Sequence, residues 1–147
     1  MSPQRPHHPQ FDALVRASFE RQGIMRTLGA DLTRVLPGQV DITVPYRKAL
    51  SQQHGYFHAG VATTLVDSAC GYAALTLMPE GSEVLSVEFK TNFLAPARGE
   101  FLRAEGRVLR AGRTITVCHG DVYAVADGEQ THCATMIATM IRVDSTA

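Results

Sequence analysis

Residues 54–78 read HGYFHAGVATTLVDSACGYAALTLM, and this stretch decides the fold. From Gly60 to Met78 almost every residue is apolar or small, and Asp67 is the only charged residue. A helix of this length is about 28 Å long, which is enough to cross a small domain. A helix that is apolar on all sides is buried by protein or lies in a membrane. The Thr, Ser and Asp residues within the stretch, and the polar strands that follow it, favour a long helix buried at the centre of a domain.

The composition is typical of a single globular domain. The chain has 147 residues, 45% of them hydrophobic and 19% charged, and 14 Lys and Arg balance 14 Asp and Glu. A formal net charge of zero gives no bulk attraction to nucleic acid or to a membrane surface. The opening residues MSPQRPHHPQ lack the apolar core of a signal peptide, which predicts a cytoplasmic protein. Three widely spaced cysteines, Cys70, Cys118 and Cys133, predict buried reduced thiols rather than a disulfide framework or a zinc site.

The segments before the long helix predict a tail, a helix and two strands. Residues 1–9 are rich in Pro and His and predict a disordered tail. Apolar residues at helical spacing predict a short amphipathic helix over residues 11–21. Residues 24–35 are expected to form the first strand, and a Pro-Gly turn leads to a second strand over residues 40–45, in which apolar and polar residues alternate.

The segments after the long helix predict four more strands, which are expected over residues 83–94, 100–110, 114–125 and 130–143. In the first of these, alternation places Leu85 and Phe89 on one face and Ser86 and Glu88 on the other. The order of the elements predicts an α+β fold, in which one antiparallel sheet wraps around the central helix and its last four strands form a meander. One domain is expected, over residues 10–147.

Three features at the start of the long helix indicate a catalytic site. Gly55 and Gly60 allow the backbone to turn sharply and to approach a ligand closely. The first turn of a helix has free N–H groups, so the amides near Ala59 and Gly60 could polarise a carbonyl oxygen. Asp67 lies nine residues after His58, and a carboxylate held there could attack an acyl carbon or activate a water. From the residues alone, a purely structural role stays open for each side chain. Asp67 could cap a buried Ser or Thr, and His58 could be a histidine whose hydrogen bonds are all made near a helix N-terminus.

The pattern of these residues resembles the signature of the hotdog-fold acyl-CoA thioesterases of the PaaI-like, phenylacetate-pathway group. That signature is Asn or Gln, then Gly, then His-Gly-Gly, then Asp or Glu nine residues after the His. Gln52, Gly55, His58-Ala59-Gly60 and Asp67 stand at these places, and Ala59 departs from the family by replacing the first Gly. The resemblance covers about residues 21–143. It extends to further segments: Leu65-Val66-Asp67, Ser86-Val87-Glu88, Phe93-Leu94-Ala95-Pro96-Ala97 and Arg110-Ala111-Gly112-Arg113-Thr114.

The resemblance implies a hotdog fold and an enzyme that hydrolyses acyl-CoA thioesters to the free acid and CoA. It implies that Asp67 is the nucleophile or general base and that the backbone amide of Ala59 polarises the thioester oxygen. It also implies that Gln52 orients the substrate carbonyl or the water, that His58 holds the loop by hydrogen bonds, and that Ser86 lies near the thioester. An apolar lining along the helix would suit an aryl or medium-chain acyl group.

The resemblance further implies an oligomer. In this family the site lies between two subunits, so Asp67 would face Gln52 and Ala59 of the partner subunit in a homodimer or in a homotetramer of two dimers. The resemblance implies no metal or redox cofactor. CoA is part of the substrate and is not counted as a cofactor. The nucleotide would lie at the surface near the break after the third strand and the hairpin that follows, where arginines suit phosphates. Three arginines stand there: Arg98, Arg110 and Arg113.

Two other functions stay open for a protein of this pattern. One is a hotdog enoyl-CoA hydratase or dehydratase, which needs a catalytic His paired with an acid in a different arrangement. The other is a non-catalytic acyl-CoA-binding protein, which Ala59 alone favours. The Gln-Gly-His-Gly-Asp pattern favours hydrolysis over hydration or dehydration. His54 and His58 lack further ligands nearby and do not predict a metal site, and His119 and His132 are expected to have structural roles.

Overall fold

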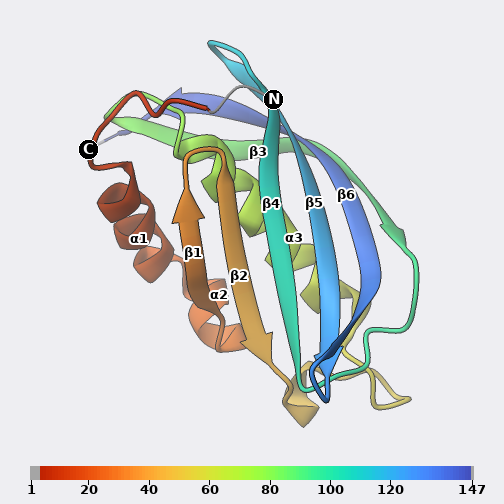
Figure 1. Cartoon of the computed structure of the whole chain (residues 1–147). Coiled ribbons are helices and arrows are strands. Elements are labelled where there is room, and N and C mark those ends of the chain that lie inside the picture. Colours follow the sequence, from red (N-terminus) through yellow and green to blue (C-terminus); the bar gives the residue numbers. More distant parts are fainter. Residues whose placement is uncertain (1–3, 147) are drawn as a thin grey trace.

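A six-stranded antiparallel sheet curves around one long helix in the computed structural model, which describes residues 4–146 (Figure 1). The elements are α1 (Phe11–Arg21), α2 (Gly23–Leu28), β1 (Asp31–Leu36), β2 (Gln39–Pro45), the 3-10 turn η1 (Lys48–Leu50), α3 (Ala59–Leu75), β3 (Ser82–Phe93), β4 (Phe101–Ala111), β5 (Ile115–Ala126) and β6 (Glu129–Asp144). The strands lie in the order β1-β2-β4-β5-β6-β3. This arrangement confirms the predicted α+β hotdog fold.

Helix α3 lies against the concave face of the sheet and forms the centre of the core (Figure 1). Leu65, Val66 and Cys70 on this helix have no exposed surface. The helix ends at Leu75, three residues before the predicted end at Met78, and the chain continues as a buried turn. The apolar character of residues 60–78 therefore predicted the burial of this segment correctly, although the last part is not helical.

Two glycines allow α3 to approach the sheet closely. Gly106 on β4 and Gly120 on β5 lie directly opposite each other in the sheet. A Cβ atom added at Gly106 would lie 2.3 Å from the carbonyl carbon of Ala69, and one at Gly120 would lie 2.3 Å from Cγ2 of Val66. Both distances are far shorter than a van der Waals contact. The helix backbone therefore rests on the sheet at this point, directly beneath the turn that carries Asp67.

The first predicted strand is wrong over its first half. Residues 23–28 form the short helix α2, in which Met25 and Leu28 are three residues apart and both buried. Gly29 ends this helix with a φ of 72°, a left-handed conformation that glycine adopts without strain. The predicted strand thus covers two short elements, α2 and most of β1. A single helical turn of apolar residues is hard to distinguish from a strand by its sequence pattern.

Strand β3 corrects the predicted meander. Strands β4, β5 and β6 follow one another as predicted, but β3 pairs with β6 rather than with β4. The connection over residues 94–100 therefore crosses the end of the sheet, as Figure 1 shows. Backbone hydrogen bonds fix this crossing, from Leu94 N–H to the Cys133 carbonyl at 2.9 Å and from Glu100 N–H to the Val125 carbonyl at 2.7 Å.

A bulge in β3 also changes the predicted alternation of its side chains. The register shifts at Val87, so that Ser86 pairs with the buried Met140 whereas Glu88 pairs with Thr139. An extra residue in one strand reverses the face on which the following side chains lie. Ser86 and Glu88 therefore lie on opposite faces, and Ser86 points toward α3.

The ends of the chain are only partly described. Residues 1–3 lie outside the described residues, so the predicted disorder of residues 1–9 stays a prediction. Within that segment, Gln4 Nε2 donates to the Val108 carbonyl at 3.1 Å, and His8 Nε2 lies 3.1 Å from a Glu80 carboxylate oxygen.

Two expectations from composition can be compared with the structure. The three cysteines are free and buried, as predicted. Between residues 4 and 146 there is no helix with the length and apolar character needed to cross a membrane.

Candidate active site

Asp67 is a half-buried carboxylate in the middle of α3. Its Oδ1 atom accepts a hydrogen bond of 2.7 Å from the Ser86 hydroxyl. Burial raises the pKa of Asp67, and the hydrogen bond from Ser86 lowers it only in part, so that the pKa stays above its ordinary value. No Lys, Arg or His within residues 4–146 forms an ion pair with Asp67. A desolvated carboxylate without a cationic partner is a candidate general base.

A cavity of about 350 Å³ opens beside Asp67, between α1, α3 and β3. A mostly apolar lining is expected for the acyl group along the helix; this cavity of one chain is only partly apolar, and the lining of the complete site stays a prediction. Apolar residues such as Val84 and Met140 supply only part of the wall. The polar residues of the wall, apart from Asp67 and Ser86, are Ser18, Arg21, Gln22, Ser68, Tyr72 and Glu83.

The loop before α3 is held by the side chain of Gln52. Its Oε1 atom accepts hydrogen bonds from the backbone N–H groups of His54, at 2.5 Å, and of Tyr56, at 3.3 Å. Gly55 lies between them with a φ of 82°, which other residues rarely adopt. The carbonyl end of Gln52 therefore shapes the loop, and its amide NH₂ group is the end available to orient a ligand.

In the first turn of α3, the backbone amides of Ala59 and Gly60 differ in their hydrogen bonds. Gly60 N–H donates to Nδ1 of His58 at 2.8 Å, so His58 caps the helix. The hydrogen bonds of residues 4–146 include none from the Ala59 N–H. A Cβ atom at Gly60 would lie 3.0 Å from His58 Nδ1, so glycine leaves room for the cap. Of the two amides, only that of Ala59 is available to a ligand.

The helix start and Asp67 lie in different cavities of the same chain. Gln52, His58 and Ala59 line the helix-start cavity, which has a volume of about 570 Å³. None of these three residues lines the Asp67 cavity. Asp67 follows Ala59 by eight residues, and eight residues of α-helix span about 12 Å. A carbonyl group that bonds to the Ala59 amide is therefore out of reach of the carboxylate in the same chain. One chain brings Ser86 to Asp67 and Gln52 to the helix start, but it does not join the two groups.

The three arginines expected to bind phosphates also lie apart. Arg98 precedes β4, whereas Arg110 and Arg113 lie at and beyond its far end, and all three are exposed. The eleven residues of β4 span roughly 35 Å. A single chain thus offers no common site for all three, and their role stays a prediction.

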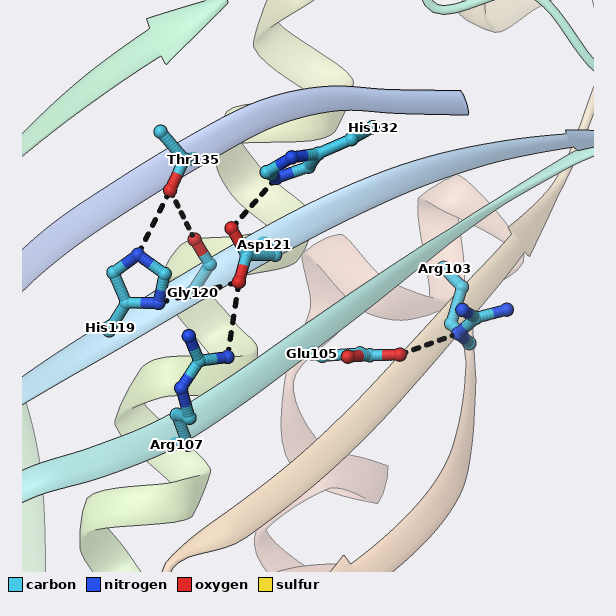
Figure 2. Close-up of polar contacts among 8 residues, drawn as sticks. All are labelled: Arg103, Glu105, Arg107, His119, Gly120, Asp121, His132 and Thr135. Atoms are coloured by element: carbon cyan, nitrogen blue, oxygen red, sulfur yellow. Dashed lines mark hydrogen bonds and ion pairs between the residues drawn. The ribbon is translucent and has the colours of Figure 1, made fainter. Parts of the chain in front are cut away.

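A polar cluster around Asp121 occupies the other face of the sheet. Figure 2 shows the Asp121 carboxylate between His132 Nε2 at 2.8 Å, Arg107 Nη1 at 3.1 Å and His119 Nδ1 at 3.4 Å. Burial acts to raise the pKa of Asp121, but the nearby Thr135 hydroxyl, the two imidazoles and the guanidinium together lower it below its ordinary value. Among residues 4–146 no group of three or more His, Cys, Asp or Glu is arranged to hold a metal ion. The cluster fits the structural role expected for both histidines.

Sequence reasoning missed the polar wall of the Asp67 cavity. Tyr72 on α3 and Ser18 on α1 meet there, with 3.4 Å between their hydroxyl oxygens. Ser68 and Tyr72 were a usable signal, because they follow Asp67 by one and five residues in an otherwise apolar helix. The contribution of α1 had no such signal, because it depends on how a separate helix packs.

Comparisons with known proteins agree with this fold. A thioesterase family protein from Silicibacter pomeroyi has a crystal structure that is 50% identical in sequence, with a TM-score of 0.90; the match covers 92% of this chain and 99% of that one. The E. coli PaaI protein, from the phenylacetic acid degradation operon, is 21% identical with a TM-score of 0.82, covering 93% and 96% of the two chains, and shares the fold.

Sequence comparisons agree with the structural ones. Human acyl-coenzyme A thioesterase 13 is 26% identical over 118 residues, which are 79% of this chain and 84% of the human protein. The sequence model of the Thioesterase superfamily matches residues 54–131, a range that contains the helix start, Asp67 and Ser86. This chain therefore belongs to the thioesterase superfamily, and its general class is that of a hotdog-fold thioester hydrolase.

Proposed function

We propose that this protein hydrolyses acyl-CoA thioesters to the free acid and CoA. The observation that carries this proposal is Asp67, a carboxylate in the middle of a buried helix, bonded by Ser86 and bordering a cavity. Burying a carboxylate without a cationic partner costs free energy, so its presence is better explained by chemistry than by stability. Membership of the thioesterase superfamily supports the same reaction.

The reaction follows from two groups. As a general base, ionised Asp67 takes a proton from a water molecule while the water oxygen bonds to the thioester carbon. The charge that develops on the thioester oxygen is stabilised by the Ala59 N–H at the start of a helix. The C–S bond then breaks, and the CoA thiolate takes the proton from Asp67. Direct attack by Asp67 would instead give an anhydride that water hydrolyses, and it would use the same groups.

The two groups are proposed to come from different subunits. About 12 Å separates Ala59 from Asp67 along one helix, so one chain cannot present both to the same carbonyl. In a homodimer, Gln52 and Ala59 of the partner subunit would face Asp67, with the Gln52 amide orienting the carbonyl or the water. A homodimer is then the smallest active unit, and a homotetramer would hold two such pairs. Neither form of the reaction requires a metal or redox cofactor.

The test is release of free thiol from phenylacetyl-CoA, benzoyl-CoA, hexanoyl-CoA and palmitoyl-CoA by the wild-type protein and by Asp67→Asn. Removal of a general base is expected to lower kcat by about 10²- to 10⁴-fold. Asp127→Asn is the matched control, because Asp127 lies in an exposed turn with a φ of 52° that Asn also tolerates. Equal rates for wild type and Asp67→Asn would exclude a catalytic role of Asp67.

The two other functions give different results in the same assays. Tight acyl-CoA binding without turnover would identify a binding protein. Hydration of an enoyl-CoA, monitored through the loss of its ultraviolet absorbance, would identify a hydratase.

A further inference from the structure

The cavity beside Asp67 ends at a group of polar side chains. Ser18 and Arg21 reach it from α1, and Glu83 reaches it from β3. A second cavity, of about 200 Å³, begins on the other side, and the same three residues line it as well. Among residues 4–146, no other residue lines both cavities. The two spaces are therefore neighbours, and the residues that they share are polar.

Two separate contacts involve these groups, one between α1 and β3 and one between α1 and α3. Arg21 Nη2 lies 3.9 Å from a Glu83 carboxylate oxygen, and Arg21 Nη1 donates to the Ala17 carbonyl at 3.1 Å. The Ser18 hydroxyl donates to the Tyr72 hydroxyl oxygen at 3.4 Å. We call Ser18, Arg21, Tyr72 and Glu83 the polar partition. It connects α1 to α3 through Ser18 and Tyr72, and α1 to β3 through Arg21 and Glu83, whose side chains are 66% and 42% exposed.

One face of α3 runs from Asp67 past the partition, and we call this face the track. Residues four apart on a helix lie on the same face, so Asp67, Gly71 and Leu75 are aligned. Gly71 lines the first cavity and leaves the track open, because it has no side chain. Leu75 lines the second cavity. The rest of the second cavity is lined by apolar residues such as Phe11, Leu14, Met78 and Pro79, together with the polar residues His8, Ser82 and Ser145.

We propose that the polar partition sets the length of the acyl group, so that the preferred substrates are acyl-CoAs whose acyl group ends within the first cavity. A longer alkyl chain would enter the second cavity only by removing water from the Arg21 and Glu83 charges and the Ser18 hydroxyl. An alkyl chain returns no hydrogen bonds for that desolvation, so the step is unfavourable. This inference rests on the proposed function and names the substrate class of the same site.

The test is calorimetric binding of hexyl-CoA and dodecyl-CoA, two thioethers that no thioesterase can hydrolyse. Wild type is expected to bind hexyl-CoA at least about tenfold more tightly than dodecyl-CoA, a ratio equivalent to about 1.4 kcal/mol. The double variant Arg21→Met/Glu83→Met removes both charges together, so neither is left unpaired. It should tighten dodecyl-CoA binding about tenfold and change hexyl-CoA binding by less than about twofold.

Two further variants make the test specific. Arg16→Met is the matched control: Arg16 is an exposed arginine on α1 that pairs with Asp12 and lines neither cavity. It should leave both affinities unchanged. Gly71→Leu places a side chain on the track and should weaken hexyl-CoA binding more than about tenfold.

The proposal is overturned if wild type binds both thioethers equally, if neither binds, or if the double variant behaves like Arg16→Met. Hydrolysis of hexanoyl-CoA and dodecanoyl-CoA by the same proteins separates this inference from the proposed function. Length-dependent thioether binding without hydrolysis of either thioester would refute the proposed reaction and leave the role of the partition supported.

Discussion

At the scale of single residues, the candidate site depends on the environment of Asp67. Burial raises its pKa, and the Ser86 hydrogen bond opposes that effect. Ser86 reaches Asp67 because the bulge at Val87 places Ser86 and Glu88 on opposite faces of β3, with Ser86 on the face toward α3. A serine nineteen residues away in sequence thus helps to set the pKa of Asp67.

Ser86→Ala is expected to move the acidic limb of the pH–rate profile to higher pH. The Ser86 hydrogen bond lowers the pKa of Asp67, so its removal raises that pKa further. A base works only when ionised, so kcat/KM begins to fall at a higher pH as the solution is acidified. The measurement is kcat/KM between pH 4 and 9, with Ser82→Ala on the same strand as the control. An unchanged acidic limb would show that the hydrogen bond does not tune Asp67.

At the scale of elements, the contact between α3 and the sheet holds Asp67 in place. Gly106 and Gly120 form an opposed pair beneath the helix, and any side chain there would collide with Ala69 or Val66. Because the interior is close-packed, the helix would have to shift as a unit to relieve such a collision. The position of Asp67 relative to β3 therefore depends on residues on the other side of the helix.

Gly106→Ala is expected to destabilise the fold by about 3 kcal/mol, at the upper end of the usual cost of overpacking. The new methyl group would lie 2.3 Å from the Ala69 backbone, which cannot move aside like a flexible side chain. The measurement is the free energy of unfolding from urea denaturation. Gly23→Ala is the control, because a Cβ atom there meets nothing within 4 Å. Equal stability of the two variants would contradict the close contact.

At the scale of the whole molecule, one edge of the sheet is exposed and apolar. Strand β3 lies at that edge, and Leu85, Val87, Phe89 and Phe93 on it are each more than two-fifths exposed. An apolar edge strand of this length is a surface on which another chain can add. The start of α3, including Ala59, is exposed as well. Both features fit the homodimer of the proposed function.

Mixing two inactive variants tests the shared site. Light scattering should give at least twice the 16.0 kDa chain mass. Asp67→Asn and Gln52→Ala should each have low activity, because each removes one half of every site. After the two are unfolded and refolded together, half of the dimers are mixed and each has one intact site, so activity should return to about a quarter of wild type. A monomeric mass, or no recovery on mixing, would show that the site is not shared.

The sequence by itself determined the elements whose signals are local. The apolar run over residues 60–78 predicted α3, and alternation with Gly and Pro turns predicted β2 to β6 to within a residue or two at most boundaries. The pattern from Gln52 to Asp67 predicted the superfamily, because it brings together residues that are close in sequence. Each of these signals is a spacing along the chain, which a helix or strand period converts directly into a shared face.

Only the tertiary structure decided the features that depend on distant pairing. The placement of β3 beside β6, the bulge that turns Ser86 toward Asp67, and the polar wall that α1 adds to the cavity all join segments far apart in sequence. The division of α2 from β1 belongs to the same class, because burial of Met25 and Leu28 outweighed a weak local pattern. No period along the chain encodes these contacts, since they arise when elements pack around a common core.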